Sequence, residues 1–454
     1  MMRDGHVTRG AWRRLCVVVW SFALGLLLGC KTPPAPQWKP PDRAAFVSPL
    51  TLEKCLELAQ SNDIRVADWQ ARLKVARAAI VTAKTLPNPT LNLVWEDIGL
   101  KDPVGGASLM SRTMTGTYPI FFWWTRPPKI ASAKAGLREE EAAIHTDLRE
   151  LVTGIATAYY GLVTDQRKVA LAKQLVKIAD ESLRLAQKKL ELGLGSGYDV
   201  QRAKTEILQA GSDLADAEGQ LRLDQLTFAF ALGADRPFYP AVVDTNDSPT
   251  LPASSISPSG KLPPSLIATA LELDPQYAKA RAAREAAEAD LHLQYRLAVP
   301  IADIPVVGGA KHEPEGYGGV VSFDVPIPLF DRNQGGIQRS QAQLLAAQAA
   351  EEKARRAAIA SFAQVWERAR TAVEKWNTHA RPLLQNLERN RRAATTLFAA
   401  GQITYTDLLQ TQRDLQQAQL KELDVWREAV VAVWTLKFEL GHRHAAPSGL
   451  QQTF

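Results

Sequence analysis

The chain alternates between long segments of helical periodicity and short segments of period two. From about Lys129 to Leu192, apolar residues recur at intervals of three and four, for example at Leu171, Leu175 and Ile178, and no proline interrupts the stretch. This spacing places the apolar side chains on one face of a helix. We therefore predict a helix of roughly 60 residues, ~90–100 Å long at about 1.5 Å per residue. A returning helix should follow at about 198–232.

Apolar and polar residues alternate in three shorter stretches. The apolar positions are Leu91, Leu93 and Trp95 in the first, Met114, Gly116, Tyr118 and Ile120 in the second, and Val321, Phe323, Val325 and Ile327 in the third. A fourth stretch, Val299 to Val307, alternates poorly and contains two prolines. One apolar and one polar face over about ten residues suits the lipid-facing and lumen-facing sides of a membrane β-barrel. Two soluble hairpins with buried faces would show the same pattern.

Two neighbouring groups of residues belong to this interpretation. Residues Phe121 to Trp124 form the run FFWW, which lies where an aromatic belt at a membrane surface would be expected. Lys311, His312 and Glu313 lie in a stretch rich in glycine and proline. We expect this stretch to be an external loop, and we expect its lone histidine to be solvated rather than bound to a metal.

The sequence contains the same unit twice. Residues 193–233 match residues 401–441 at an offset of 208 without a gap, and residues 117–130 match 324–337 at an offset of 207. Pro89 matches Pro300 at an offset of 211. Self-similarity of this kind indicates a duplicated structural unit.

The duplication divides the chain into successive parts. We expect a signal peptide at 1–29, a Pro-rich tether at 30–50, a first repeat at 51–236, a crossover linker at 237–261, a second repeat at 262–441 and a tail at 442–454. Each repeat should contain an opening helix, a β-hairpin, a long helix and a returning helix. The opening helices are expected at about 52–85 and 262–297, and Pro382 should kink the second long helix.

The turn between the long and returning helices is similar in both repeats. Gly193 and Gly401 can end a helix in the left-handed conformation. The residues after them form capping boxes, Ser196-x-x-Asp199 and Thr404-x-x-Asp407. The additional glycines of the first turn, in LGLGSG, are absent from the second, and neither turn has the GK[ST] ending of a nucleotide-binding loop. The glycines therefore mark helical tips rather than a phosphate site.

The N-terminus indicates export and lipid attachment. A basic segment precedes an apolar run that ends in Leu27-Leu28-Gly29-Cys30, which looks like a bacterial lipobox with Cys30 as the lipidated residue. The next residue is Lys31 rather than the aspartate that is associated with retention in the inner membrane of enteric bacteria, so the outer membrane is favoured. An ordinary signal peptide with a chance cysteine is the alternative.

Composition excludes several classes of protein. The net charge is +6, of which four arginines and one aspartate in the first 29 residues account for +3, so nucleic-acid binding is not indicated. After loss of the leader and lipidation of Cys30, only Cys55 remains as a free thiol, which permits no disulfide. No nucleophile–base pair and no His or Cys pair has the spacing of a catalytic or metal site. We therefore expect no enzyme activity, no cofactor and no bound metal.

Four carboxylates are candidates for a role in transport. Asp199 and Asp407 could form a ring around an aperture at the tips, or could serve only to cap the helices, which the helix dipole favours. Glu96 and Asp324 lie in or beside the strands and could line a lumen. For Glu96 and Asp324 we expect a generic polar lining rather than a selective site.

The number of strands requires several copies of the chain. Two hairpins give four strands per chain, whereas about eight are the fewest that usually close a membrane barrel. Open edges are not tolerated in hydrocarbon. Two chains would supply eight strands and three would supply twelve, and the strand pattern does not choose between them.

Taken together, the lipobox, the duplicated unit, the G-x-x-[ST]-x-x-D tips and the sequence PIPLFDRNQGGI resemble the TolC family of outer-membrane efflux proteins. The match covers about residues 50–441. The segment PIPLFDRNQG at 326–335, with Pro382, is most similar to the heavy-metal cation branch of the cobalt-zinc-cadmium type. The first repeat departs from this motif, with WWTRPP at 123–128 in place of FDRNQG.

The resemblance implies a mainly α-helical protein with a membrane β part. Three copies would form a homotrimer with one shared 12-stranded barrel in the outer membrane and a long α-helical barrel in the periplasm. Around Gly193, Ser196, Asp199, Gly401, Thr404 and Asp407, the tips would contact a periplasmic adaptor and, through it, an inner-membrane pump. The protein would then be a passive, lipid-anchored exit duct. A periplasmic coiled-coil structural lipoprotein is the alternative, and it would explain the helices but not the alternating strands.

Overall fold

The computed structural model describes residues 49–62, 64–96, 98–99, 111–119, 121–244, 247–252, 262–299, 304–313, 316–323, 325 and 327–441. All of them belong to one compact unit. The predictions for the signal peptide, Cys30, Asp324 and the C-terminal tail lie outside the described residues.

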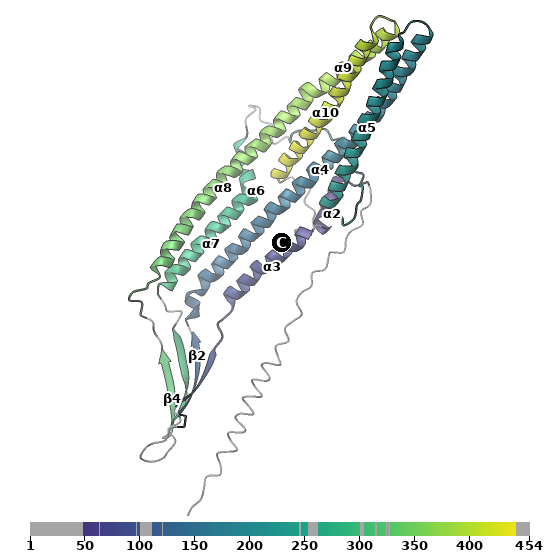
Figure 1. The fold of residues 1–454 in the computed structure, drawn as a ribbon. Helices are drawn as coiled ribbons and strands as arrows, with labels where there is room; N and C mark the ends of the chain where they lie inside the picture. The colour runs from purple at the N-terminus through teal and green to yellow at the C-terminus, as the bar shows by residue number, and fades with distance from the viewer. Residues whose placement is uncertain are drawn as a thin grey trace, which may run out of the picture. The chain divides into compact units, whose positions relative to one another are not determined.

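Helices and strands follow the order expected for a duplicated unit (Figure 1). The first repeat contains α2 (Leu52–Asn62), α3 (Ile64–Lys84), β1 (Thr90–Glu96), β2 (Ser111–Pro119), η1 (Phe122–Trp124), α4 (Arg126–Glu191) and α5 (Gly197–Ala231). The second contains α6 (Pro264–Leu273), α7 (Pro275–Leu297), β3 (Pro305–Glu313), β4 (Gly316–Phe323), α8 (Gln334–Lys375), the π-helical segment η4 (Trp376–Ala380), α9 (Arg381–Ala399) and α10 (Tyr405–Glu439). The described fold is therefore mainly α with a small β part, as predicted.

The long helix of the first repeat is confirmed, with 66 residues in α4. It begins with prolines in its first turn, where the missing N–H has no helical partner to lose. In the second repeat the corresponding helix is divided into α8, η4 and α9. The π-helical turn accommodates one additional residue, which explains why the offset between repeats is 207 before it and 208 after it. Pro382 lies in the first turn of α9, directly after this segment.

The opening helix of the second repeat is broken, contrary to the single helix predicted at 262–297, and the opening segment predicted as one helix at 52–85 is described as two, α2 and α3. In the second repeat, Asp274 has an extended backbone and its side chain accepts a hydrogen bond from the Tyr277 N–H. Pro275 then occupies the first position of α7. An N-cap followed by proline is a strong start signal, so a new helix begins where the periodicity alone suggested a continuous one.

The helices lie side by side in a single layer. Near the strands the order is α3, α4, α7, α8, and toward the tips it is α5, α4, α10, α9 (Figure 1). The helix α4 runs through both parts and contacts α7 and α10 of the second repeat. One edge of the layer is therefore made by α3 and α5 of the first repeat, and the other by α8 and α9 of the second.

The four strands form one antiparallel sheet in the order β1-β2-β3-β4. Its register places Leu93 opposite Met114, Met114 opposite Ala310, and Val306 opposite Phe323. Directly opposed residues share a face, so the apolar positions that lie within the strands, among them Leu93, Met114 and Phe323, are on one side of the sheet, and most of them are exposed. The predicted alternation is confirmed.

The position of the third strand was predicted wrongly. β3 begins at Pro305 rather than near Val299, and Lys311 to Glu313 lie within it instead of in an external loop. The glycines that suggested a loop permit close strand pairing, because a Cβ at Gly309 would lie 2.1 Å from the Met114 carbonyl oxygen. β4 ends at Phe323, so Val325 and Ile327 lie outside it.

Candidate functional site

The first tip connects α4 to α5 through a left-handed glycine and a capping box. Gly193 has φ +67°, and the Leu194 N–H donates to the Lys189 carbonyl oxygen at 2.9 Å, as in a Schellman motif. The Ser196 hydroxyl then accepts from the Tyr198 N–H at 3.1 Å. The Asp199 carboxylate accepts from the Ser196 N–H at 3.3 Å. The predicted cap geometry is confirmed.

The second tip repeats this arrangement between α9 and α10. Gly401 has φ +76°, and Thr404 Oγ1 accepts from the Asp407 N–H at 3.2 Å. The Asp407 carboxylate accepts from the Thr404 N–H at 3.0 Å and from its hydroxyl at 2.6 Å. These hydrogen bonds from Thr404, the hydroxyl foremost, lower the pKa of Asp407. The carboxylates are thus engaged in capping, and their role at an aperture stays a prediction.

The two tips pack together as one unit. A hydrophobic cluster joins them, made by Ala186, Ala203, Ala394, Phe398, Tyr405, Leu408 and Leu409. Around it, Lys189 donates to the Phe398 carbonyl oxygen at 2.6 Å and lies over its ring. Arg413 pairs with Glu206 at 2.7 Å. Residues of both repeats therefore form the hydrophobic cluster of the tips and the polar contacts around it.

Tyr405 is a feature of the tip that sequence reasoning missed. Its side chain is 3% exposed, and its hydroxyl has no hydrogen-bond partner among the described residues. Burial, with a smaller effect of the Glu206 and Asp199 carboxylates, raises the pKa of Tyr405 to about 12. The only sequence signal was its position directly after the capping threonine.

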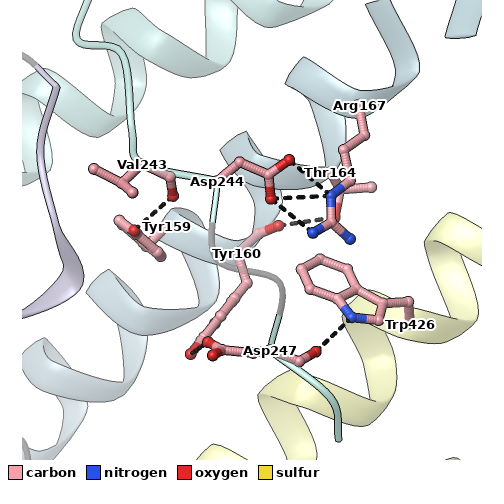
Figure 2. A network of polar contacts seen from close by, with 8 residues as sticks. All are labelled: Tyr159, Tyr160, Thr164, Arg167, Val243, Asp244, Asp247 and Trp426. Carbon is pink, nitrogen blue, oxygen red and sulfur yellow. Dashed lines mark hydrogen bonds and ion pairs between the residues drawn. The ribbon is translucent and has the colours of Figure 1, made fainter. Parts of the chain in front are cut away.

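A polar network fixes the crossover segment against the middle of the helical layer (Figure 2). Tyr159 donates to the Val243 carbonyl oxygen at 2.9 Å, and Arg167 binds Asp244 through two nitrogens. The Trp426 indole donates to the Asp247 carbonyl oxygen at 2.9 Å. The crossover is thereby held to α4 and α10, which belong to different repeats.

The start of the first repeat is attached to the same segment. Leu50 and Val242 form a parallel β-bridge, with hydrogen bonds from the Leu50 N–H to the Ala241 carbonyl and from the Val243 N–H to the Leu50 carbonyl. Beside it, Cys55 is fully buried, and burial raises the pKa of its thiol to about 12. Cys55 is accordingly a packing residue rather than a reactive thiol.

A carboxyl pair lies between α4 and α5. Asp165 and Asp224 line one hollow together with Arg427. Burial, followed by a hydrogen bond with Asp224, raises the pKa of Asp165 to about 6. No spacing of residues along the chain indicates this pair, because helix packing alone brings the two residues together.

Among the candidate lumen residues, Glu96 is described and Asp324 is not. Glu96 lies opposite Ser111, whose hydroxyl donates to its carboxylate at 3.3 Å. It occupies the face of the sheet opposite to Leu93 and Trp95. Within the described ranges, three or more His, Cys, Asp or Glu side chains nowhere gather in a way that could hold a metal ion.

Among the helices of the described residues, none combines the length and the apolar character needed to cross a bilayer.

The helices of the two repeats form one layer, and this layer ends in an exposed sheet with one apolar face. This combination defines a subunit of an outer-membrane channel. The chain belongs to the outer membrane efflux protein family, whose model matches residues 55–234 and 266–442. It is thus an outer-membrane efflux channel, as the sequence predicted, and its family is one of channels rather than enzymes.

Similar proteins agree with this assignment. The cobalt-zinc-cadmium resistance protein CzcC of Cupriavidus metallidurans is 25% identical over 396 residues, covering 87% of this chain and 90% of CzcC. The pyoverdine export outer membrane protein OpmQ of Pseudomonas aeruginosa is 24% identical over 390 residues, covering 80% of this chain and 78% of OpmQ. Among solved structures, CusC superposes with a TM-score of 0.68 at 17% identity, covering 90% of this chain and 99% of CusC. VceC of Vibrio cholerae has a TM-score of 0.66 at 18% identity, covering 86% and 96%.

Proposed function

We propose that this channel is the exit duct of a tripartite efflux system, assembled as a homotrimer. The observation that carries the proposal is the four-stranded sheet with an exposed apolar face, in which β1 and β4 have no further strand beside them among the described residues. Unpaired strand edges are not tolerated in hydrocarbon. Three copies would close a barrel of twelve strands, which is within the range of outer-membrane barrels.

The tips are the proposed contact with a periplasmic adaptor. Leu192, Leu194 and Tyr198 are 63%, 77% and 70% exposed at the first tip. Exposed apolar side chains grouped at the end of a helical hairpin favour a protein partner. Through the adaptor, an inner-membrane pump would supply both the cargo and the energy, and this chain would conduct passively.

Heavy-metal cations are the proposed cargo. Three relatives are named for resistance to such metals: CzcC, the nickel-cobalt-cadmium resistance protein NccC of Alcaligenes xylosoxydans xylosoxydans, and the nickel and cobalt resistance protein CnrC of Cupriavidus metallidurans. The PIPLFDRNQG segment supports the same branch. OpmQ, a pyoverdine exporter, represents the competing class of organic cargo. We further propose lipid attachment at Cys30 and the division of the chain into the parts predicted from its duplication.

Substitution on the two faces of one strand tests the channel. Phe323→Arg would place a charge on the apolar face, at a cost of about 2–4 kcal/mol near the bilayer midplane. We expect this variant to be lost from the outer-membrane fraction and to give no pores in planar bilayers. Ser322→Arg, on the opposite face of the same strand, should assemble and alter conductance.

Equal assembly of both variants would contradict a lipid-facing sheet. It would favour the periplasmic coiled-coil structural lipoprotein, which accounts for the helices but for neither the sheet nor the family match.

A further inference from the structure

The first repeat departs from the second where the sheet joins the long helix. It reads WWTRPP at 123–128, whereas the second repeat reads FDRNQG at 330–335. A barrel and a helical layer built from two equal repeats do not require this difference. In the structure, one groove of about 450 Å³ lies at the start of α4, lined by Trp123, Arg126, Pro127, Ile130, Ala131 and Lys134. The departure in sequence therefore coincides with a hollow that combines two cations with an indole.

The indole of Trp123 is held at this groove by its neighbour Trp124. The Trp124 indole donates to the Arg296 carbonyl oxygen at 3.0 Å, and the Arg296 guanidinium donates to the Trp124 carbonyl oxygen at 2.6 Å. Trp124 is thereby fixed to the end of α7. Trp123 packs edge-to-face on Trp124 with ring centroids 6.0 Å apart, yet it stays 54% exposed. A large indole that is fixed in place and half exposed is typical of the boundary between water and lipid.

The two cations of the groove are not neutralised by carboxylates in the part of the chain that the structure describes. Arg126 donates through one terminal nitrogen to the carbonyl oxygen of Lys84, the last residue of α3, at 2.7 Å. The Nε of Arg126 is buried and has no hydrogen-bond partner there. Lys134 is exposed. The N-terminal end of α4 adds a partial positive charge at the same place, so the groove favours an anion.

The geometry of the helix brings Lys134 toward Arg126. The Cα–Cβ bonds of an α-helix tilt toward its N-terminus, and long side chains lie over the preceding turn. Lys134 lies about 12 Å from Arg126 along the axis, at about 1.5 Å per residue, and both residues line the same groove as Ile130 between them. We therefore expect the ammonium group and the guanidinium group to act on one anion.

The groove lies on the face of the helical layer that carries the crossover. Lys134 precedes Tyr159 by 25 residues, about seven turns of α4 at about 3.6 residues per turn, and Tyr159 donates to the Val243 carbonyl oxygen of the crossover. Irregular segments belong on the outer surface of a closed tube, so this face is the outer one. Helix α4 has α3 on one side and α7 on the other (Figure 1), which places the groove away from both edges of the layer.

The second repeat has no cation at the corresponding positions. An offset of 207 takes Arg126 to Asn333 and Lys134 to Gln341. Both counterparts are neutral amides, and both donate hydrogen bonds at 2.9 Å to residues near the end of α7. The pair of cations is therefore specific to the first repeat and is not a general property of the junction between sheet and helix.

Resting on the proposed lipid-facing sheet, we propose that this groove binds one phospholipid of the periplasmic leaflet. Arg126 and Lys134 bind its phosphate through charge-assisted hydrogen bonds. Its glycerol backbone and the upper part of one acyl chain lie on Trp123, Pro127 and Ile130.

The chemistry of the groove favours a phospholipid over a soluble anion. A free phosphate would satisfy the two cations but leave the apolar residues of the groove exposed to water. β2 ends at Pro119, a few residues before Trp123, so the groove borders the sheet whose apolar face is proposed to contact lipid. A phospholipid at this border keeps its acyl chains in hydrocarbon while its phosphate contacts the cations.

Native mass spectrometry of the full-length protein in detergent tests the site, with dioleoylphosphatidylglycerol as the probe. We expect one tightly bound molecule per chain. Lys134→Gln, which introduces the residue type of the second repeat, should weaken binding by roughly tenfold. Lys129→Gln is the matched control, because Lys129 is an exposed cation of the same helix end that does not line the groove, and it should leave binding unchanged. Neither inorganic phosphate nor dioleoylglycerol should displace the phospholipid.

The outcomes separate this inference from the proposed function. Equal phospholipid binding by the unmodified chain and by Lys134→Gln would overturn the site while leaving a pore-forming channel intact. Displacement by inorganic phosphate alone would indicate a site for soluble anions and would overturn the lipid assignment. Absence of pores from the unmodified protein in planar bilayers would overturn the proposed duct, whereas Lys134-dependent binding in the same preparation would still support the lipid site.

Discussion

Thr404 and Asp407 each satisfy a backbone N–H of the other at the start of α10. In the Thr404→Ala variant, the Asp407 N–H loses its acceptor, which should destabilise the first turn of α10 by about 1 kcal/mol. Hydrogen exchange of the amides in that turn should accelerate. The exposed turn substitution Gln402→Ala is the control, and equal exchange in both variants would contradict a stabilising cap.

The lowered pKa of Asp407 sets the pH range of this cap. Because the folded state favours the ionised carboxylate, the stabilisation is fully present above the ordinary aspartate pKa of about 4. It is lost only as the pH falls through the lowered value. The tip should therefore keep its capped structure at neutral and mildly acidic pH.

The opposite sign applies to Asp165. Its pKa is raised to about 6, so the folded state holds a proton more tightly than the unfolded chain, and stability falls as the pH rises from about 4 to 6. In Asp165→Asn this loss should disappear. The gain at neutral pH should be smaller than the ~3 kcal/mol that about two pKa units represent, because the carboxyl group is only half-buried and partly screened by solvent. Thermal unfolding at pH 4.5 and 7.5 measures the difference. The same result from Asp213→Asn, a partly exposed aspartate on α5 that is not paired with another carboxylate, would indicate a general charge effect instead.

Local chemistry explains which residues the sequence revealed. Gly193, Gly401 and the two capping boxes act on their own backbone within a few positions, so their roles could be predicted without a fold. The buried hydroxyl of Tyr405 and the Asp165–Asp224 pair depend on how separate helices meet. Contacts of that kind leave no trace in the spacing of residues along the chain.

At the scale of elements, glycine determines how closely β2 and β3 can pair. An added Cβ at Gly309 would lie 2.1 Å from the Met114 carbonyl oxygen, whereas a Cβ at Gly308 would have nothing within 4 Å. Gly309→Ala should therefore separate the strands and reduce outer-membrane assembly severely, while Gly308→Ala should assemble normally. Heat-resistant oligomers on gels report the result, and comparable yields of the two variants would refute the close approach.

The predicted elements were correct where one strong periodicity ran unbroken. The long helix and the alternation at Leu91–Trp95 are examples. The errors have two causes. Glycines suggested a loop at Lys311 to Glu313, where tertiary strand pairing overrides the local signal, and the periodicity across Asp274 concealed a helix break that a local N-cap followed by proline produces. Strand pairing and capping chemistry determined these boundaries.

For the whole molecule, the duplication was the most informative feature of the sequence. It predicted the order of elements, the paired tips and the need for several copies. It did not reveal η4, the π-helical segment that interrupts only the second long helix. One additional residue changes the offset between the repeats, but the offset does not show which turn of the helix accommodates that residue. Nor did it show that the crossover joins Leu50 to both repeats, since those contacts involve loop backbone.

The two tips share a backbone but differ in chemistry. Leu194, Gly195 and Gly197 of the first stand where Gln402, Ile403 and Tyr405 stand in the second. A trimer would thus present six similar hairpin ends of two alternating kinds. A partner that recognises only one kind would bind with a stoichiometry of three per channel, whereas a partner that tolerates both would bind with six. In the proposed trimer, the difference between two short turns would therefore decide how many adaptor subunits the duct can recruit.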